Sequence, residues 1–202
     1  MDGRTSRTIW ARHPVHEWQP ARIDTVDEDR GVFTVEFGDK FLLELSGTPA
    51  DYAPALMSKV NPKVTNLCEV ENICEAEAFM IIKNRCIGDE YFTFAGSALI
   101  SVNPQKYVNM YNNEWMRKAR NQIHPHIYSV AETAFGHLEH ELQNQFVIVT
   151  GESNSGKTVT NRHLHDYFAQ RTSPTLVAKD DSAISLHIRI ENAHALLDAV
   201  GS

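Results

Sequence analysis

The sequence predicts an α/β fold that is preceded by a small all-β unit. Residues 9–45 alternate apolar and polar side chains in short runs separated by turn-forming residues, a pattern typical of antiparallel strands. Residues 146–150 form an apolar, β-branched run that is followed by a glycine-rich segment and then by a helical pattern. That order is typical of a parallel sheet with helices on its faces. We place the first unit at residues 9–62 and the second at residues 63–202.

Composition and charge restrict the class of protein. Of the 202 residues, 42% are apolar and 22% are charged, close to the average of globular domains, so a packed core is expected. The formal net charge is −7 and no run of basic residues is present, which argues against a nucleic-acid partner. No stretch reaches the roughly 18 apolar residues of a membrane span, and residues 1–12 lack the apolar core of a signal peptide. We therefore expect a cytoplasmic protein.

The first unit is predicted to be a β-meander. Four strands are expected at residues 9–12, 21–25, 32–37 and 40–45, with turns at residues 27–31 and 38–39. Strands this short do not form a stable open sheet, so we expect a small closed barrel or sandwich. Its core should include the partly buried aromatic residues Trp10, Trp18, Phe33 and Phe37. The proline-containing residues 46–63 should form a connector.

The second unit is predicted to begin with a helix or a pair of helices over residues 65–85, followed by two strands at residues 91–94 and 98–102. Pro125 should open an amphipathic helix. The apolar face of that helix is formed by Ile127, Val130, Ala131, Ala134, Phe135, Leu138 and Leu142. Residues 146–150 should be a strand buried on both faces, and residues 157–169 should form the helix after it.

Residues 151–158 carry the chemical signal. They read Gly151, Glu152, Ser153, Asn154, Ser155, Gly156, Lys157 and Thr158, which fits the phosphate-binding P-loop pattern G-x-x-x-x-G-K-[ST] in full. Such a loop directs backbone N–H groups and a helix N-terminus at phosphates. Lys157 would supply a charge to the phosphates and Thr158 a hydroxyl ligand to Mg²⁺. The alternative is a glycine turn between a strand and a helix that binds no ligand.

A second group of residues is a candidate for the base of a nucleotide. Asn103 and Pro104 follow the strand expected at residues 98–102, and Tyr111 lies in the loop after it. Polar and planar groups at the end of a strand suit an adenine contact. The alternative is an ordinary Asn-Pro turn with a half-buried tyrosine. We assign no catalytic residue.

Together these segments resemble the myosin family. GESNSGKT at 151–158 resembles the myosin form GESGAGKT, NPQKYVNMY at 103–111 is similar to NPYKWLPVY, and PHIY at 125–128 is similar to PHIF. Residues 85–104 resemble RYxxDxIYTYxGxxLIAVNP, and LLDAVG at 196–201 looks like the start of LEAFGNAKT. The likeness covers about residues 64–201. Residues 9–62 more loosely resemble the small β-barrel that precedes many myosin motors.

The resemblance implies ATP and Mg²⁺ as ligands, an actin filament as partner of the full-length parent, and a cytoskeletal place in the cytoplasm. It also implies that residues 151–158 surround the triphosphate and that Asn103, Pro104 and Tyr111 contact or frame the adenine. Asn154 replaces a glycine of the family motif, and asparagine is the least costly non-glycine residue where φ is positive.

The family's switch segments, NxNSSRFGK and DxxGxE, do not occur in this sequence. We therefore expect the P-loop region of an incomplete motor, which binds ATP without efficient turnover. Two alternatives stay open. One is another P-loop ATPase or kinase, whereas a GTPase would carry the absent N-K-x-D motif. The other is a non-motor interaction fragment with a vestigial P-loop.

Overall fold

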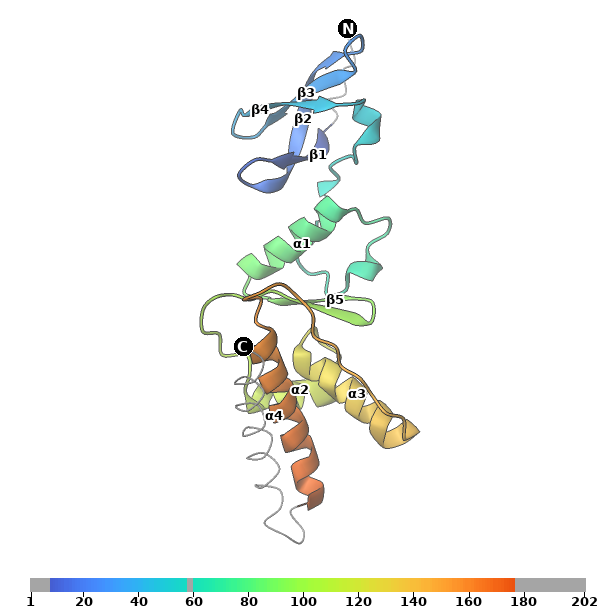
Figure 1. Ribbon diagram of the computed structural model, residues 1–202, viewed down its shortest axis with the longest axis vertical. Helices are drawn as coiled ribbons and strands as arrows, with labels where there is room; N and C mark the ends of the chain where they lie inside the picture. The colour runs from blue at the N-terminus through green and yellow to red at the C-terminus, as the bar shows by residue number, and fades with distance from the viewer. Residues whose placement is uncertain (1–7, 58–59, 177–202) are drawn as a thin grey trace. The chain divides into compact units, whose positions relative to one another are not determined.

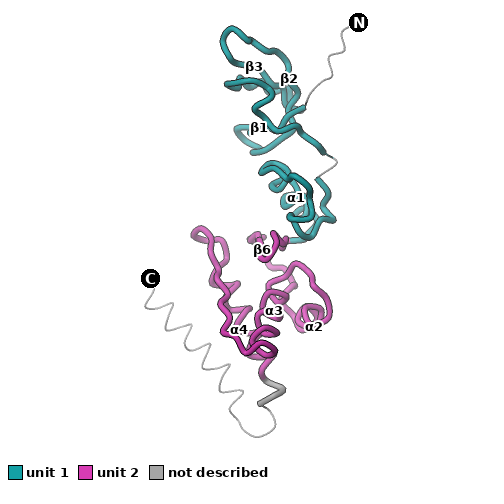
Figure 2. The backbone as a smooth tube through the Cα atoms, turned by 90° about the vertical axis from the view of Figure 1, so that its right-hand side faces the viewer, with its two compact units in different colours: residues 1–90 teal, residues 91–202 magenta. Residues whose placement is uncertain are grey.

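A computed structural model describes residues 8–57 and 60–176 (Figure 1). The chain divides into two compact units, residues 1–90 and 91–202 (Figure 2). The predicted boundary at residues 62 and 63 stays a prediction. The LLDAVG segment at 196–201 lies outside the described residues.

The first unit contains a four-stranded antiparallel sheet. Its strands are β1 (Thr8–His13), β2 (Glu17–Asp27), β3 (Val32–Phe37) and β4 (Leu42–Ser46), in the order β1-β2-β3-β4. The predicted meander and its turns are thus confirmed. Residues 53–55 add two hydrogen bonds to β1, and an isolated bridge joins Ile9 to Pro54. Closure into a barrel, the finer part of the prediction, stays a prediction.

The core of this sheet is clearest in β3, where burial alternates along the strand. In β3, Phe33, Val35 and Phe37 are buried while the residues between them are half-buried. Alternate residues of a strand point to one face, so these three side chains share a single apolar layer. The buried members of the layer are Ile9, Ala11, Ala21, Phe33, Val35 and Phe37.

The helix or helix pair predicted over residues 65–85 is confirmed only in part. Residues 67–69 form only one turn of 3-10 helix, and α1 spans Glu75–Ile87. Asn72 has a φ of 49°, a left-handed conformation that interrupts a helical backbone. The helix starts after Cys74, whose N–H donates to the Glu77 carboxylate at 3.1 Å. The cap at Cys74 and the left-handed Asn72 therefore decide where the helix begins, although the spacing of apolar residues predicts an earlier start.

Buried Arg85 ties the end of α1 to the connector. Its guanidinium donates to the carbonyls of Pro62 and Val64 at 3.0 and 2.9 Å and lies 3.6 Å from the carboxylate of Glu90. These contacts satisfy a charge that is 3% exposed. A buried charge needs such partners, because an unpaired one would be costly.

The described part of the second unit, residues 91–176, contains a β-hairpin and three helices. The hairpin strands β5 (Phe92–Ala95) and β6 (Ala98–Ser101) pair with each other, as predicted. The helices are α2 (Asn113–Asn121), α3 (Ile127–Glu141) and α4 (Lys157–Leu176). α3 starts two residues after Pro125, with His126 as its N-cap. Its predicted apolar face is buried at Ile127 and Ala131 but exposed at Leu138 and Leu142.

The strand predicted at residues 146–150 is wrong for this structure. These residues form no strand, and Phe146 and Ile148 are 87% and 86% exposed. A parallel strand that is buried on both faces needs neighbouring strands and covering layers. Within the described part of the second unit, β5 and β6 pair only with each other. The α/β prediction is therefore confirmed only as a mixture of strands and helices.

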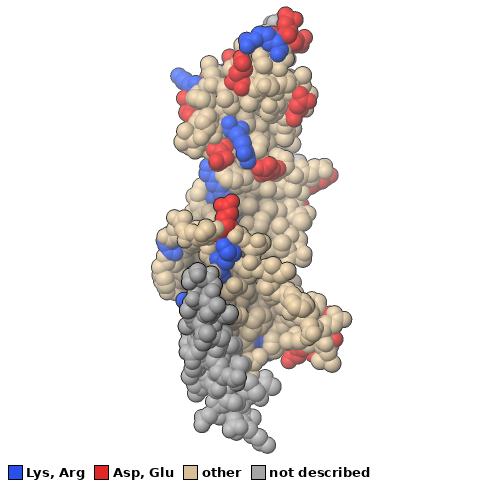
Figure 3. Space-filling model, in the orientation of Figure 1, with Lys and Arg blue, Asp and Glu red and all other residues tan. Residues whose placement is uncertain are grey.

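The charged side chains are spread over the face that Figure 3 shows and are not gathered there in one patch of a single sign. Basic and acidic side chains are interspersed over its coloured surface. None of the helices formed by residues 8–57 and 60–176 is long and apolar enough to cross a membrane.

Candidate nucleotide-binding site

The phosphate-loop candidate joins residues 142–150, which form no regular secondary structure, to the start of α4. Three of its residues have positive φ: Gly151 (153°), Asn154 (63°) and Gly156 (95°). A Cβ on Gly151 would lie 2.7 Å from the Ser155 hydroxyl oxygen. The spacing of glycines predicted from the sequence is therefore required by the backbone, and Asn154 adopts the positive φ that the sequence allowed for.

Lys157 closes the loop onto the start of α4. Its ammonium donates to the carbonyls of Gly151 and Glu152 at 2.9 and 2.6 Å, and the N–H of Ser155 donates to the Glu152 carbonyl at 3.2 Å. Thr158 is exposed at the second position of the helix. A cation and a hydroxyl thus lie where a helix N-terminus adds a partial positive charge.

Asn103 reaches this loop from the end of the β5-β6 hairpin. Its amide Nδ2 donates to the Asn154 carbonyl at 3.1 Å, and its Oδ1 accepts from the N–H of Gln105 at 3.0 Å. Pro104 beside it is half-buried. The structure therefore brings the predicted base-binding segment into contact with the predicted phosphate loop, although the two are 51 residues apart.

Tyr111 lies against α4 instead. Its ring stacks on His163 with a centroid distance of 3.7 Å and an interplanar angle of 11°. The ring also meets Phe92 and Tyr128 edge-on. Burial raises the pKa of the Tyr111 hydroxyl and lowers the pKa of His163, which lies 3.6 Å from Asp166. One face of the tyrosine is thus covered by an imidazole of this chain.

His126 caps α3, a role that the sequence alone did not assign to it. Its Nδ1 accepts from the N–H of Tyr128 at 3.1 Å and caps α3, so Nε2 carries the proton and donates to the Met110 carbonyl at 3.1 Å. The pKa of His126 is lowered to about 4, chiefly by burial and also by the nearby His124 and His163, while the bond to Met110 opposes the shift. Histidine is not among the residues preferred at a helix N-cap, so the sequence offered no strong signal for this role.

α3 holds α4 through Glu132. Its carboxylate accepts from the Tyr167 hydroxyl at 2.6 Å and from Arg171 Nε at 3.2 Å. The Arg171 guanidinium also lies over the Phe135 ring at 4.4 Å and near Glu139. These contacts fix the helix whose first residue is Lys157.

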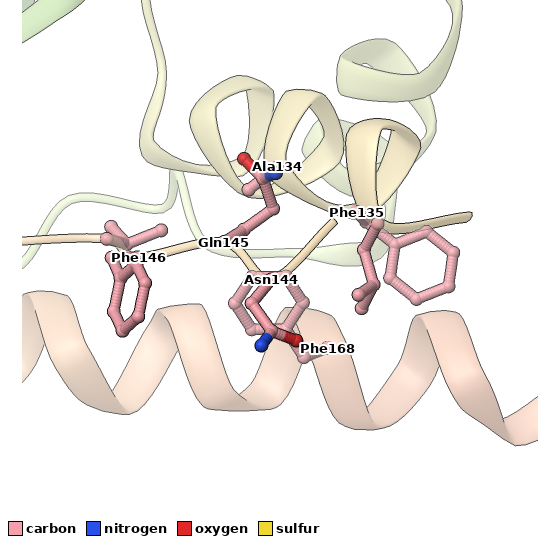
Figure 4. Close-up of a pocket in the computed structure, with 8 residues that line it drawn as sticks. Ala134, Phe135, Asn144, Gln145, Phe146 and Phe168 are labelled. Atoms are coloured by element: carbon pink, nitrogen blue, oxygen red, sulfur yellow. The ribbon is translucent and has the colours of Figure 1, made fainter. Parts of the chain in front are cut away.

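An apolar cavity of about 520 Å³ lies elsewhere in the unit, and Figure 4 shows the side chains that line it. Its lining is Ala134, Phe135, Leu138, Asn144, Gln145, Phe146, Val147 and Phe168. No charged residue and no residue of the 151–158 loop belongs to this set. The cavity lacks groups that bind phosphate, so we place the candidate site at the loop.

Three side chains of the first unit lie close enough together to be considered as metal ligands. They are His13, His16 and Asp39, and their ligand atoms lie within 4.8 Å of one another. His13 Nδ1 accepts from the N–H groups of Val15 and His16 at 3.1 and 3.2 Å. The neutral ring then carries its proton on Nε2, which faces Asp39 at 3.3 Å. A protonated nitrogen is no ligand, so this group does not fit a metal.

Comparison with known proteins agrees on one family. The family described as myosin head (motor domain) matches residues 64–202, more than half of the chain. The chain is similar to the high molecular weight form of myosin-1 of Acanthamoeba castellanii, with 29% identity over 83% of this chain and 11% of that protein.

It is also similar to myosin-4 of Saccharomyces cerevisiae, with 29% identity over 84% of this chain and 12% of that protein. Myosin-52 of Schizosaccharomyces pombe is 29% identical over 79% of this chain and 11% of its own length. The chain thus spans only about a ninth of the length of these relatives.

Proposed function

This chain belongs to the myosin head (motor domain) family, and we propose that its loop at residues 151–158 binds ATP with Mg²⁺. The observation that carries the proposal is the loop itself: positive φ at Gly151, Asn154 and Gly156, closed by Lys157 at the start of α4. A loop of this kind offers phosphates a cation and the positive end of a helix. Residues with these properties fit a triphosphate.

Individual residues have distinct parts in this proposal. Lys157 supplies the positive charge to the phosphates, and the exposed hydroxyl of Thr158 supplies a ligand to Mg²⁺. Glu152, Ser153 and Ser155 form the exposed rim of the loop. Mg²⁺ neutralises phosphate charge when bound.

We further propose that the base lies near Pro104 and Tyr111. Tyr111 is held by its stack on His163 and by edge contacts with Phe92 and Tyr128. Planar rings suit a contact with adenine.

For the whole protein we propose ATP hydrolysis coupled to movement on actin filaments, in the cytoplasm and the cytoskeleton. Family membership supports this proposal. Because the chain covers 11 to 12% of the relatives' length, the activity is proposed for the whole protein only.

The test compares two lysine substitutions that remove the same charge. Lys157→Ala should weaken binding of a fluorescent ATP analogue in Mg²⁺ at least tenfold, because its ammonium is the cation of the loop. Lys118→Ala is the control, since Lys118 pairs with Glu114 on α2 at 3.1 Å. Titration by fluorescence anisotropy measures both.

Equal affinities of the two variants would refute the phosphate-loop proposal. Absence of binding in the unaltered chain would favour the alternative, a vestigial loop in a protein whose role is interaction.

A further inference from the structure

We infer that Asn103 is a positioning residue that holds the phosphate loop in its binding conformation, and not a contact to the base. The inference rests on the proposed function and changes the part that Asn103 has in it. Its basis is the pair of hydrogen bonds that this one amide makes, to Asn154 and to Gln105.

The orientation of the Asn103 amide follows from its partners. Oδ1 lies 3.0 Å from an N–H, that of Gln105, and Nδ2 lies 3.1 Å from a carbonyl, that of Asn154. Rotating the amide by 180° would place oxygen against oxygen and NH₂ against N–H. Both ends of the side chain are therefore used within the protein, and one of them is fixed on the phosphate loop.

The bonded residue is the one that most needs support. Asn154 has a φ of 63°, an uncommon conformation for a residue with a Cβ. A hydrogen bond to its carbonyl favours this conformation over the extended and helical alternatives. Loss of the bond would allow the residue to relax and the loop to change shape.

Asn103 also packs on the next glycine of the loop. A Cβ on Gly156 would lie 3.7 to 3.8 Å from the Asn103 side chain, at ordinary van der Waals distance. Gly156 directly precedes Lys157, so the same asparagine borders the loop at two of its three positive-φ residues. The end of β6 and the start of α4 are thereby linked through one side chain.

A positioning role and a base contact predict different losses. If Asn103 acts through the loop, its removal weakens every ligand that the loop binds by its phosphates, with or without a base. If Asn103 contacts the base, only ligands with a base are weakened. Inorganic tripolyphosphate and a fluorescent ATP analogue, both with Mg²⁺, separate these cases.

The first experiment needs no ligand. Hydrogen exchange of the amides of residues 151–157 is compared between the unaltered chain, Asn103→Ala and the control Asn109→Ala. Asn109 lies in the same loop as Asn103, and its side chain accepts from Asn112. We expect exchange in the 151–157 segment to be several-fold faster in Asn103→Ala alone. Unchanged exchange in Asn103→Ala would overturn the inference.

The second experiment measures affinity for the two ligands. Asn103→Ala should weaken tripolyphosphate and the ATP analogue by the same factor, about fivefold, the size of one net hydrogen bond. In an Asn154→Gly background the same substitution should cost less, because glycine adopts positive φ without strain. A loss confined to the ATP analogue would overturn the inference in favour of a base contact.

The two experiments also separate this inference from the proposed function. If the unaltered chain binds neither ligand, the proposed function fails, and the exchange of residues 151–157 still decides whether Asn103 holds the loop.

Discussion

Two regions of the molecule have strand-like sequences, but only one of them forms strands. The four-stranded sheet of the first unit forms as its sequence predicts, whereas the apolar segment at residues 146–150 does not. In β3 the run Val32–Phe37 pairs on both sides, with β2 and β4. The run at 146–150 is more apolar, yet it forms no strand and is mostly exposed. β3 has partners that follow it or precede it through short turns, whereas a parallel strand needs partners that are distant in sequence. Strand composition therefore predicts a strand only where the pairing is also local.

The largest expected effect comes from replacing a phenylalanine by alanine in each of the two regions. Phe33→Ala removes a ring that is 1% exposed in the sheet core and should lower the free energy of unfolding of the first unit by about 3 to 5 kcal/mol. Phe146→Ala removes a ring that is 87% exposed and should change stability by less than about 0.5 kcal/mol. Urea denaturation, followed by hydrogen exchange at β3 and α3, measures both values.

A loss at Phe146→Ala as large as that at Phe33→Ala would contradict the contrast. It would mean that residues 146–150 are buried in solution, as a paired strand would be.

The next test uses a buried polar contact of the second unit. The pKa of His126 is about 4, below its usual 6.5, chiefly because the ring is buried. The unfolded chain therefore binds more protons than the folded one between these values, and stability rises with pH across that window. The stability that the fold gains from keeping His126 neutral is complete above about pH 6.5 and lost below about pH 4. Its size is about 3 kcal/mol.

Hydrogen exchange of the α3 amides from pH 4 to 7 measures this dependence, after correction for the intrinsic exchange rate. His126→Asn keeps a good N-cap residue but has no titrating ring, so its slope should be much flatter. His124 and His163 also lower the pKa of this ring. An unchanged slope in His126→Asn would contradict the assignment of the effect to His126.

Local features of the fold could be predicted from the sequence. The bounds of β3, the start of α4 at Lys157 and the hairpin turns follow from alternation, glycine positions and the phosphate-loop pattern. The positive φ of Asn154 was also accessible, since asparagine replaced glycine in a known spacing. Each of these signals lies within a few residues of the structure it predicts.

The remaining features depend on contacts between distant residues. The bond from Asn103 to Asn154 spans 51 residues, and the stack of Tyr111 on His163 is similarly remote in sequence. No periodicity or spacing reports such pairs, so the sequence assigned both Asn103 and Tyr111 to the base. The helix expected at residues 65–74 does not form for a local reason, because Asn72 has a left-handed backbone conformation. The spacing of apolar residues does not predict that conformation.

The smallest expected effect comes from the turns between the strands of the first unit, whose positions could be predicted from the sequence. Gly31, in the β2-β3 turn, has a φ of 61°, and a Cβ there would meet no atom within 4 Å. Gly31→Ala therefore adds backbone strain without a clash and should cost about 1 kcal/mol. Gly38, in the β3-β4 turn, also has open space around it but is not among the glycines with positive φ. Gly38→Ala should be neutral or stabilise by up to about 1 kcal/mol, because alanine restricts the unfolded chain.

Urea denaturation of the two alanine variants measures the difference, and its sign is the informative result. The surroundings of the two glycines are equally open, so a difference reports φ alone. If both variants were equally stable, turn conformation would contribute little to the sheet. The pairing of β2, β3 and β4 would then depend on the apolar layer of Phe33, Val35 and Phe37, and the contrast with residues 146–150 would reduce to whether such a layer is present.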